Sequence, residues 1–190
     1  TQYTVYGISA VTAGTDKKEY SYDKLGRLSA SRQYAGEALT DETGYIYDAF
    51  GRKVRERNGE DIAKEYSYDA NSNLLTYTLK EYEIPKSTAS YTYNSLNQLT
   101  EMTGDGILST YGYDANGNLT EKTAGTLETV YTYNARNLPV SMTNKNGETV
   151  CNAYQYAYTL DGKRTGENET GGVNKAYQYD GLGRLTRENQ

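Results

Sequence analysis

One short phrase recurs along the chain at nearly constant intervals, and it limits what the chain can fold into. The pattern Tyr-x-Tyr occurs eight times in phase, and successive copies begin 25, 21, 25, 20, 20, 25 and 21 residues apart. These pairs use 16 of the 22 tyrosines. Such a period is typical of a small supersecondary unit that packs against copies of itself. The first tyrosines of the pairs are Tyr20, Tyr45, Tyr66, Tyr91, Tyr111, Tyr131, Tyr156 and Tyr177.

Turn-forming residues follow each tyrosine pair. The next residue is Asp or Asn in seven of the eight copies, with Thr159 as the exception. Three residues further on stands Gly in five copies and Asn in two, and Ser72 fits this position least well. An Asp or Asn side chain accepts hydrogen bonds from nearby backbone N–H groups, and Gly or Asn tolerates positive φ. The pattern predicts a type I turn followed by a left-handed residue, which closes a β-hairpin with a bulge.

The residues around these turns predict strands. The two rings of Tyr-x-Tyr lie on one face of a strand, because side chains alternate with period two. Each repeat is therefore expected to be a strand, a tight turn, a second strand and a return. Length varies almost wholly in the return, so the 25-residue repeats are expected to have longer return strands, including over residues 82–89, rather than loose loops. No window keeps the apolar spacing of a helix over several turns, so almost no helix is expected.

The fold class that follows is all-β: repeated antiparallel β-hairpins joined into a long curved sheet. Residues 1–19 are expected to form a lead-in strand or partial repeat, and residues 20–190 the eight repeats, about sixteen strands in total. Because apolar residues are 36% of the chain, with one Phe and no Trp, a core would be built mostly from tyrosine. Tyrosine can bury its ring while its hydroxyl stays hydrated, which suits a sheet with half-wet faces better than a dry interior. The start, TQYTVYGISA, has no leader character, and the chain stops just after the eighth hairpin, so we interpret it as a fragment of a larger protein.

Composition argues against several classes of function. The net charge is −5 and the sequence has no basic stripe, so binding to nucleic acid is not expected. No apolar run is long enough for membrane insertion. The chain has no His and one cysteine, Cys151, interpreted as a half-buried strand residue. His-based nucleophile pairs and a structural zinc site are thereby excluded. No catalytic, cofactor-binding or metal-binding residue is predicted, and the chain is not expected to be an enzyme.

The acidic residues allow more than one interpretation. The periodic Asp residues could serve as calcium ligands, but one acid per repeat leaves each ion short of ligands, so capping of the turns is favoured. Asp41, Glu42, Glu56, Glu60 and Asp61 are interpreted as solvated loop charge. A hydrolase fragment that uses carboxylates is the weakest alternative, because nothing in the sequence supplies a substrate pocket.

The aromatic and basic residues also allow two interpretations. Exposed tyrosines could stack on sugar rings, but cross-strand tyrosine pairs that stabilise the sheet are favoured. The basic residues that follow the turn glycines (Arg27, Arg52, Arg184 and the variant Lys163) are expected to pair with acids of the neighbouring hairpin and to mark the register. The tyrosines outside the pairs are expected to be freer for contacts: Tyr3, Tyr6, Tyr34, Tyr77, Tyr82 and Tyr154.

The first and last copies, YSYDKLGRL at residues 20–28 and YQYDGLGRL at residues 177–185, resemble the YD repeat of Rhs proteins. Similar repeats occur in shell components of bacterial Tc insecticidal toxins, in bacterial wall-associated proteins and in teneurins. The copies YTYNSLNQL, YAYTLDGKR and YTYNARNLPV depart from the pattern, although their phase is kept. The resemblance implies a sheet that spirals into a hollow shell. Eight repeats are too few to close it, so an open section of the wall is expected.

The resemblance also implies a function. It points to a non-catalytic structural segment of a secreted or cell-surface protein that encloses or presents another part of the parent polypeptide, such as a toxin. The expected partners are other YD repeats of the same parent chain and an enclosed toxin or C-terminal domain. The alternative is a Tyr-rich adhesion or carbohydrate-binding module that binds a glycan or a protein at the cell surface. Unpaired edge strands near Tyr6 or Leu185 also predict some self-association.

Overall fold

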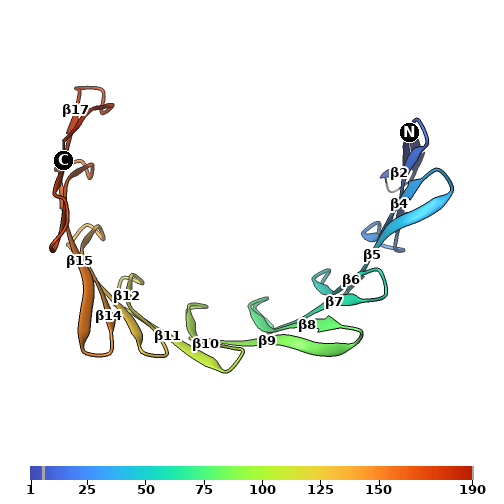
Figure 1. Cartoon of the computed structure of the whole chain (residues 1–190), viewed down its shortest axis with the longest axis horizontal. Coiled ribbons are helices and arrows are strands. Elements are labelled where there is room, and N and C mark those ends of the chain that lie inside the picture. The colour runs from blue at the N-terminus through green and yellow to red at the C-terminus, as the bar shows by residue number, and fades with distance from the viewer. Residues whose placement is uncertain (6, 190) are drawn as a thin grey trace. The chain divides into compact units, whose positions relative to one another are not determined.

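The computed structural model describes every residue except Tyr6 and Gln190. The described residues form eighteen β-strands and no helix, so the all-β fold class is confirmed. The chain divides into two compact units, Thr1–Tyr91 and Thr92–Gln190, and each is described by itself. Figure 1 shows that within each unit the strands follow one another in chain order as hairpins.

The first unit contains β1 to β8 and nearly all of β9. Within it, each strand pairs in antiparallel fashion with the next strand of the chain, from β1–β2 through β8–β9. The strands are β1 (Gln2–Thr4), β2 (Gly7–Ala13), β3 (Asp16–Tyr22), β4 (Leu28–Ala35), β5 (Ala38–Tyr47), β6 (Lys53–Asn58), β7 (Ile62–Tyr68), β8 (Leu74–Glu81) and β9 (Ile84–Tyr93).

The second unit follows the same plan, with antiparallel pairs from β10–β11 through β17–β18. Its strands are β10 (Leu99–Gly104), β11 (Ile107–Tyr113), β12 (Leu119–Ala124), β13 (Leu127–Tyr133), β14 (Pro139–Asn146), β15 (Thr149–Tyr158), β16 (Arg164–Glu169), β17 (Lys175–Tyr179) and β18 (Leu185–Asn189). β3 to β18 are the sixteen strands of the eight repeats, and the residues before them form two further strands, β1 and β2.

A five-residue turn follows every tyrosine pair. In the first of them, the Asp23 backbone N–H donates to the Arg27 carbonyl at 2.8 Å, and the Gly26 N–H donates to the Asp23 carbonyl at 3.0 Å. The same two bonds recur in all eight turns at 2.8 to 3.2 Å. The fourth turn residue has positive φ in every copy, including Ser72 with φ of 71°. The hairpin turn predicted from the sequence is therefore confirmed.

The returns differ in strand length, as expected. In the three long returns the strands have eight and ten residues (β4–β5, β8–β9 and β14–β15), whereas most short returns have six and seven. Residues 84–89 lie on β9 after a two-residue turn. Each long return contains a bulge in which the register skips one residue: Thr40, Lys86 and Cys151. The added length is therefore paired strand.

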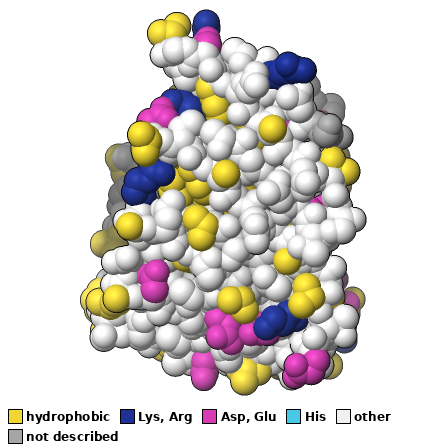
Figure 2. Space-filling view, turned by 90° about the vertical axis from the view of Figure 1, so that its left-hand side faces the viewer, with side chains coloured by type: hydrophobic (Ala, Val, Ile, Leu, Met, Phe, Trp, Pro, Cys, Tyr) yellow, Lys and Arg dark blue, Asp and Glu magenta, His cyan; other side chains and the backbone are white. Residues whose placement is uncertain are grey.

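Neither unit has a dry interior. The only buried residues in the described part of the chain are Ala10, Ala63 and Ser109, and no large side chain is fully buried. All sixteen phased tyrosines are half-buried. Each unit is one layer of sheet whose two faces remain open, so the tyrosines form half-buried faces rather than a dry interior, as expected. Figure 2 shows hydrophobic side chains spread among polar atoms on one face. No helix among the described residues could span a membrane.

Candidate functional site

The first residue of each turn organises the backbone around it. Asp23 Oδ1 accepts hydrogen bonds from the N–H groups of Leu25 and Arg27, both at 2.9 Å, and its Oδ2 accepts one from Arg27 Nε at 2.7 Å. Asn94 forms the same two backbone bonds with a neutral amide. In the exceptional copy, the hydroxyl of Thr159 accepts from the Lys163 N–H at 2.9 Å. The periodic Asp and Asn residues are turn caps.

These contacts favour the ionised form of the turn carboxylates. The Arg27 N–H holds the pKa of the Asp23 carboxyl below its usual value, and the Asn118 side chain does the same for the pKa of Asp114. Beside the Lys163 ammonium group, the pKa of Asp161 falls to about 2. The acids of the turns are therefore charged at neutral pH and committed to local hydrogen bonds.

Side chains of one turn also reach the next turn. Arg27 Nη1 donates to the Asp48 carbonyl at 3.1 Å, and Arg52 Nη1 donates to the Asp69 carbonyl at 2.6 Å. In the second unit, Asn118 Nδ2 donates to Asn137 Oδ1 at 2.9 Å. The expected pairing of Arg27 and Arg52 with acids of the neighbouring hairpin is therefore wrong. Each arginine pairs with the acid of its own turn and binds a backbone carbonyl of the neighbour.

Lys163 and Arg184 follow the same rule, because they pair with Asp161 and Asp180 of their own turns. The reason lies in the chain geometry. The carboxylate of the turn points back over its own backbone, where the fifth residue is the nearest cation. The Arg27 guanidinium therefore reaches a backbone carbonyl of the next turn, that of Asp48, which also accepts the Gly51 N–H.

The second tyrosine of seven of the eight pairs joins its hairpin to the preceding one. The Tyr47 hydroxyl donates to the Leu28 carbonyl at 2.9 Å, and the Tyr133 hydroxyl donates to the Leu119 carbonyl at 2.7 Å. In both cases the acceptor is the first residue of the second strand of the preceding hairpin. The other bonds of this kind run from Tyr22 to Ile8, Tyr68 to Lys53, Tyr113 to Leu99, Tyr158 to Pro139 and Tyr179 to Arg164, at 2.7 to 2.9 Å.

Basic side chains cover several of the phased rings. The Arg27 guanidinium lies 4.7 Å from the centre of the Tyr47 ring, and the Lys53 ammonium lies 5.9 Å from that of Tyr45 and 5.3 Å from that of Tyr66. Ring-to-ring contacts are also present: Tyr66 meets Tyr77 across β7 and β8 at 5.6 Å. The expected cross-strand tyrosine pairs thus account for part of the packing, and cation–π contacts for another part.

The tyrosines outside the pairs divide into two groups. Tyr3 and Tyr82 are exposed, as expected of residues available for contacts. Tyr34, Tyr77 and Tyr154 are half-buried, so the expectation is wrong for them. The hydroxyls of Tyr34 and Tyr154 donate to Glu19 and Glu169, at 3.1 and 2.9 Å, and the Tyr77 ring contacts Tyr66. Tyr6 lies outside the described residues.

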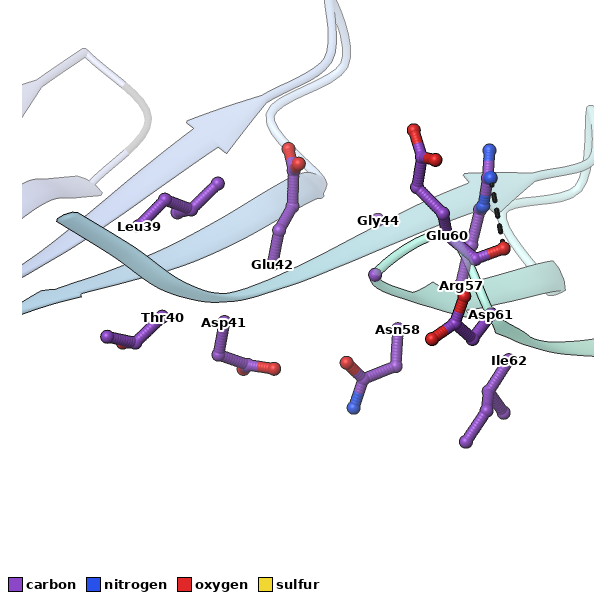
Figure 3. A pocket seen from close by; sticks show the side chains of 11 residues that line it. Leu39, Thr40, Asp41, Glu42, Gly44, Arg57, Asn58, Glu60, Asp61 and Ile62 are labelled. Atoms are coloured by element: carbon purple, nitrogen blue, oxygen red, sulfur yellow. Dashed lines mark hydrogen bonds between the residues drawn. The ribbon is translucent and has the colours of Figure 1, made fainter.

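The acidic residues singled out from the sequence lie around the β5–β6 and β6–β7 segments. A groove of about 670 Å³ is lined by Asp41, Glu42, Glu60 and Asp61, together with Arg57 and other residues. Figure 3 shows that Glu42 and Glu60 extend to one side of the ribbon and Asp41 to the other, so these acids do not converge. No cluster of three or more metal-ligating residues occurs in the described part of the chain.

The interpretation of these acids as solvated loop charge is partly wrong. Asp41 and Glu42 lie half-buried on β5, and Glu56 lies half-buried on β6, whereas Glu60 and Asp61 are exposed in the turn before β7. The strand acids are ion-paired: Glu42 with Arg32 at 2.6 Å and Glu56 with Lys53 and Lys64. Glu42 and Glu56 are thus neutralised by bases of the same or an adjacent strand, and Asp41 accepts a hydrogen bond from Gln33.

Cys151 is exposed, so the expectation of a half-buried strand residue is wrong. The cause is its position. It lies on β15, where the register passes from Asn152 directly to Val150 and leaves Cys151 without a partner on β14. An unpaired bulge residue escapes the regular alternation of the strand.

Comparison with known proteins gives a family and a fold. No curated protein matches the sequence. Residues 93–126 and 113–149 match the RHS repeat family. The fold resembles the crystal structure of TcdB2-TccC3-Cdc42, with a TM-score of 0.67 and 15% identity over 92% of this chain and 11% of that chain. The crystal structure of TcdB2-TccC3-TEV matches with a TM-score of 0.63 and 15% identity over 90% of this chain and 12% of that chain. The crystal structure of TcdB2-TccC3 matches with a TM-score of 0.61 and 15% identity over 91% of this chain and 13% of that chain.

Hairpins closed by Asx-to-Gly turns and joined by tyrosine hydroxyls define a β-hairpin-repeat protein. The repeat-family match within residues 93–149, together with the shared fold, supports an Rhs/YD-repeat protein, as the sequence resemblance implied. At 15% identity the solved structures show the fold alone, which is that of the Tc toxin shell structures. The chain spans between 11% and 13% of the length of those structures.

Proposed function

We propose that the chain is a non-catalytic segment of the wall of an Rhs/YD-repeat shell. In this proposal the eight repeats that begin near residue 20 are part of a longer, secreted or extracellular polypeptide, and the wall encloses or presents another part of it, such as a toxin. The observation that carries the proposal is the open single-layer sheet, whose hairpins are joined by repeated tyrosine bonds instead of a core. Such a sheet separates two spaces without needing a second layer.

The two faces of the first unit differ in aromatic content, which suits a wall between two environments. Strand alternation puts the phased tyrosines on one face. The other face lacks these rings and carries ion pairs across the strands, such as Arg32 with Glu42 at 2.6 Å and Lys80 with Glu65 at 2.8 Å, whereas the ion pair between Glu56 and Lys64 lies among the tyrosines. The use of seven tyrosine hydroxyls as donors to backbone carbonyls leaves the alternative, a carbohydrate-binding face, without support from these residues.

Thiol labelling of the two faces tests the proposal. Ile46 and Ile62 are exposed residues of the first unit, and the pairing of β5, β6 and β7 puts them on opposite faces. Each is changed to Cys in a Cys151→Ser background, in the parent polypeptide. For a wall, one of the two thiols reacts much more slowly with a bulky maleimide than the other, and the difference disappears in denaturant. Equal rates on both faces in the native parent would rule out an enclosing wall.

A further inference from the structure

A parallel pair of tyrosine rings lies on β15 in the second unit. Tyr154 stands two residues before the phased Tyr156, so both side chains lie on the same face of the strand. The ring centres are 6.4 Å apart, and the angle between the ring planes is 4°. By comparison, the rings of Tyr66 and Tyr77 are tilted by 48°. Two parallel rings on one strand suit a flat partner, which can lie along a ring face.

A carboxylate lies directly opposite the first ring. Glu169 on β16 is the cross-strand partner of Tyr154, and the Tyr154 hydroxyl donates to Glu169 Oε1 at 2.9 Å. This hydrogen bond raises the pKa of the Tyr154 hydroxyl, which therefore stays protonated at neutral pH. A Cβ atom on Gly172 would come within 2.5 Å of Glu169 Oε2, so the glycine leaves the space that the carboxylate occupies. The tyrosine and the glycine together fix the position of the carboxylate.

The charge of this carboxylate is not balanced by a neighbouring base. Arg164 and Lys175 both pair with Glu167, at 2.8 and 3.4 Å. Among the residues that the structure describes, no basic side chain pairs with Glu169, whose side chain accepts only the Tyr154 hydroxyl. The site therefore combines two aromatic rings with one carboxylate that is available to a cation.

A similar tyrosine and glutamate in the first unit already hold a cation. The Tyr34 hydroxyl donates to Glu19 at 3.1 Å, across the same 15 residues of sequence that separate Tyr154 from Glu169. The Lys17 ammonium lies 5.5 Å from the centre of the Tyr34 ring and pairs with Glu19. The first pair thus binds a base of its own chain, and the comparison shows which kind of ligand the second pair lacks.

The contacts of the chain itself favour arginine as this ligand. The described guanidinium groups that lie over aromatic rings are 4.4 to 5.1 Å from the ring centres, whereas the ammonium groups are 5.3 to 5.9 Å away. A planar guanidinium stacks on a ring and also donates two parallel hydrogen bonds to a carboxylate, which a compact ammonium cannot do. Arg164 already lies over Tyr156 at 4.4 Å, and Glu167 balances its charge.

We infer that Tyr154, Tyr156 and Glu169 form a binding site for an arginine side chain of another polypeptide segment. The guanidinium packs against the two rings and donates two hydrogen bonds to the Glu169 carboxylate, which has acceptor sites beyond the one used by the Tyr154 hydroxyl. The inference deepens the proposed function and rests on it in one respect: the source of the side chain is the part of the parent polypeptide that the wall encloses or presents.

Titration of the full chain with short peptides, followed by NMR of the tyrosine rings, tests this inference. The peptides have the sequence Gly-Ser-X-Ser-Gly with blocked ends, where X is arginine, lysine or citrulline, which has nearly the shape of arginine without its charge. The arginine peptide is expected to shift the Tyr154 and Tyr156 signals saturably and to bind about fivefold more tightly than the lysine peptide. The citrulline peptide is expected to give no saturable shift. Tyr34, whose site Lys17 fills, is expected not to respond.

Two variants test the role of the carboxylate. Glu169→Gln keeps the shape of the side chain and removes its charge, so it is expected to weaken binding of the arginine peptide about tenfold. Glu128→Gln is the matched control, because Glu128 is also half-buried in the second unit but pairs with Lys145 at 3.0 Å. Binding to this control is expected to be unchanged. Far-ultraviolet circular dichroism checks that both variants keep their strands.

Three results would overturn the inference. They are equal binding of the three peptides, equal weakening in the two variants, and saturable ring shifts with a methyl glycoside but none with the arginine peptide, which would assign the rings to a sugar. The peptide comparison uses the unchanged chain, so it decides even if Glu169→Gln does not fold. A failed titration leaves the labelling contrast between Ile46 and Ile62 unaffected, and equal labelling leaves the titration unaffected, so the two proposals fail separately.

Discussion

At the scale of the residue, the two tyrosines of a pair have different contacts although they share a face. In the sixth repeat, the Tyr133 hydroxyl donates to the Leu119 carbonyl at 2.7 Å across the boundary between two hairpins. Tyr131, two residues earlier, is half-buried on the same strand. The bond to the preceding hairpin makes Tyr133 the residue whose hydroxyl joins successive repeats.

Changing Tyr133 to Phe removes this hydroxyl and keeps the ring. We expect the free energy of unfolding to fall by about 1 kcal/mol, because one partly buried hydrogen bond is lost and the Leu119 carbonyl is left without it. Changing Tyr131 to Phe is the matched control and is expected to cost less. Urea unfolding of both variants at pH 7 measures the difference. Equal losses for the two variants would contradict the assigned role.

The turn carboxylates make stability depend on pH. The Asn118 side chain donates to Asp114 Oδ2 at 2.9 Å and lowers the pKa of Asp114. Because the folded pKa lies below the unfolded value of about 3.9, the carboxylate contributes its full stability above that pH. The contribution is lost as the pH falls through the folded pKa. Acid therefore weakens the turn by protonating its cap.

Changing Asp114 to Asn separates the charge from the turn cap. Asn94 shows that a neutral amide caps the same turn. The Asn variant is therefore expected to fold at pH 7 and to lose less stability than the parent between pH 5 and pH 2, whereas Asp114→Ala is expected to be weaker at every pH. Urea midpoints measured across this pH range give the comparison. An unchanged pH profile in the Asn variant would show that the Asp114 charge contributes nothing.

At the scale of the element, the long returns show how a sheet accommodates an odd number of added residues. Strand pairing tolerates additions in twos, because an odd addition turns every following side chain to the other face. The long returns have two more residues on one strand and three more on the other than most short ones. The bulges at Thr40, Lys86 and Cys151 absorb the odd residue, and the tyrosine pairs keep their face.

The bulge predicts the reactivity of the single thiol. Cys151 is exposed because it has no partner on β14. A small thiol reagent such as 5,5′-dithiobis(2-nitrobenzoate) is expected to modify it in the native protein as completely as in urea, with circular dichroism unchanged. Cys151→Ser serves as the blank. If the thiol reacted only after unfolding, Cys151 would be buried in the native sheet, and residue 151 would not be the bulge residue.

The sequence predicted the elements well wherever a single repeat determines them. Turn geometry depends on five adjacent residues, and return length depends on the spacing, so both were predictable. The acceptor of Tyr47 lies 19 residues away on another hairpin, and the carbonyl bound by Arg27 lies 21 residues away. Such partners depend on how hairpins align, which no local pattern specifies. The exposure of Cys151 was missed because the position of a bulge has no signature in strand composition.

At the scale of the whole molecule, the chain behaves as a sum of similar parts. Each strand pairs with its neighbours in sequence within a unit, and no described side chain larger than Ser fills an interior. In such repeat proteins stability is the sum of the hairpins and of the contacts between adjacent hairpins. Charge is distributed just as regularly, since the described return turns contain six acids and no basic residue. A change that removes the contact between two hairpins is thus expected to lower the stability of the hairpins next to that contact most.

Amide hydrogen exchange, followed by NMR in the native protein, tests most directly whether the repeats are hairpins closed by Asx-to-Gly turns. In the turn at residues 48–52, the amides of Asp48, Phe50, Gly51 and Arg52 donate hydrogen bonds to Asp48 or Arg52, and Ala49 is the turn amide with no such acceptor. The turn at residues 114–118 has the same pattern around Ala115. We expect four slow amides and one fast amide in both turns. Uniformly fast exchange, or protection of Ala49 and Ala115 equal to that of their neighbours, would contradict the hairpin repeat.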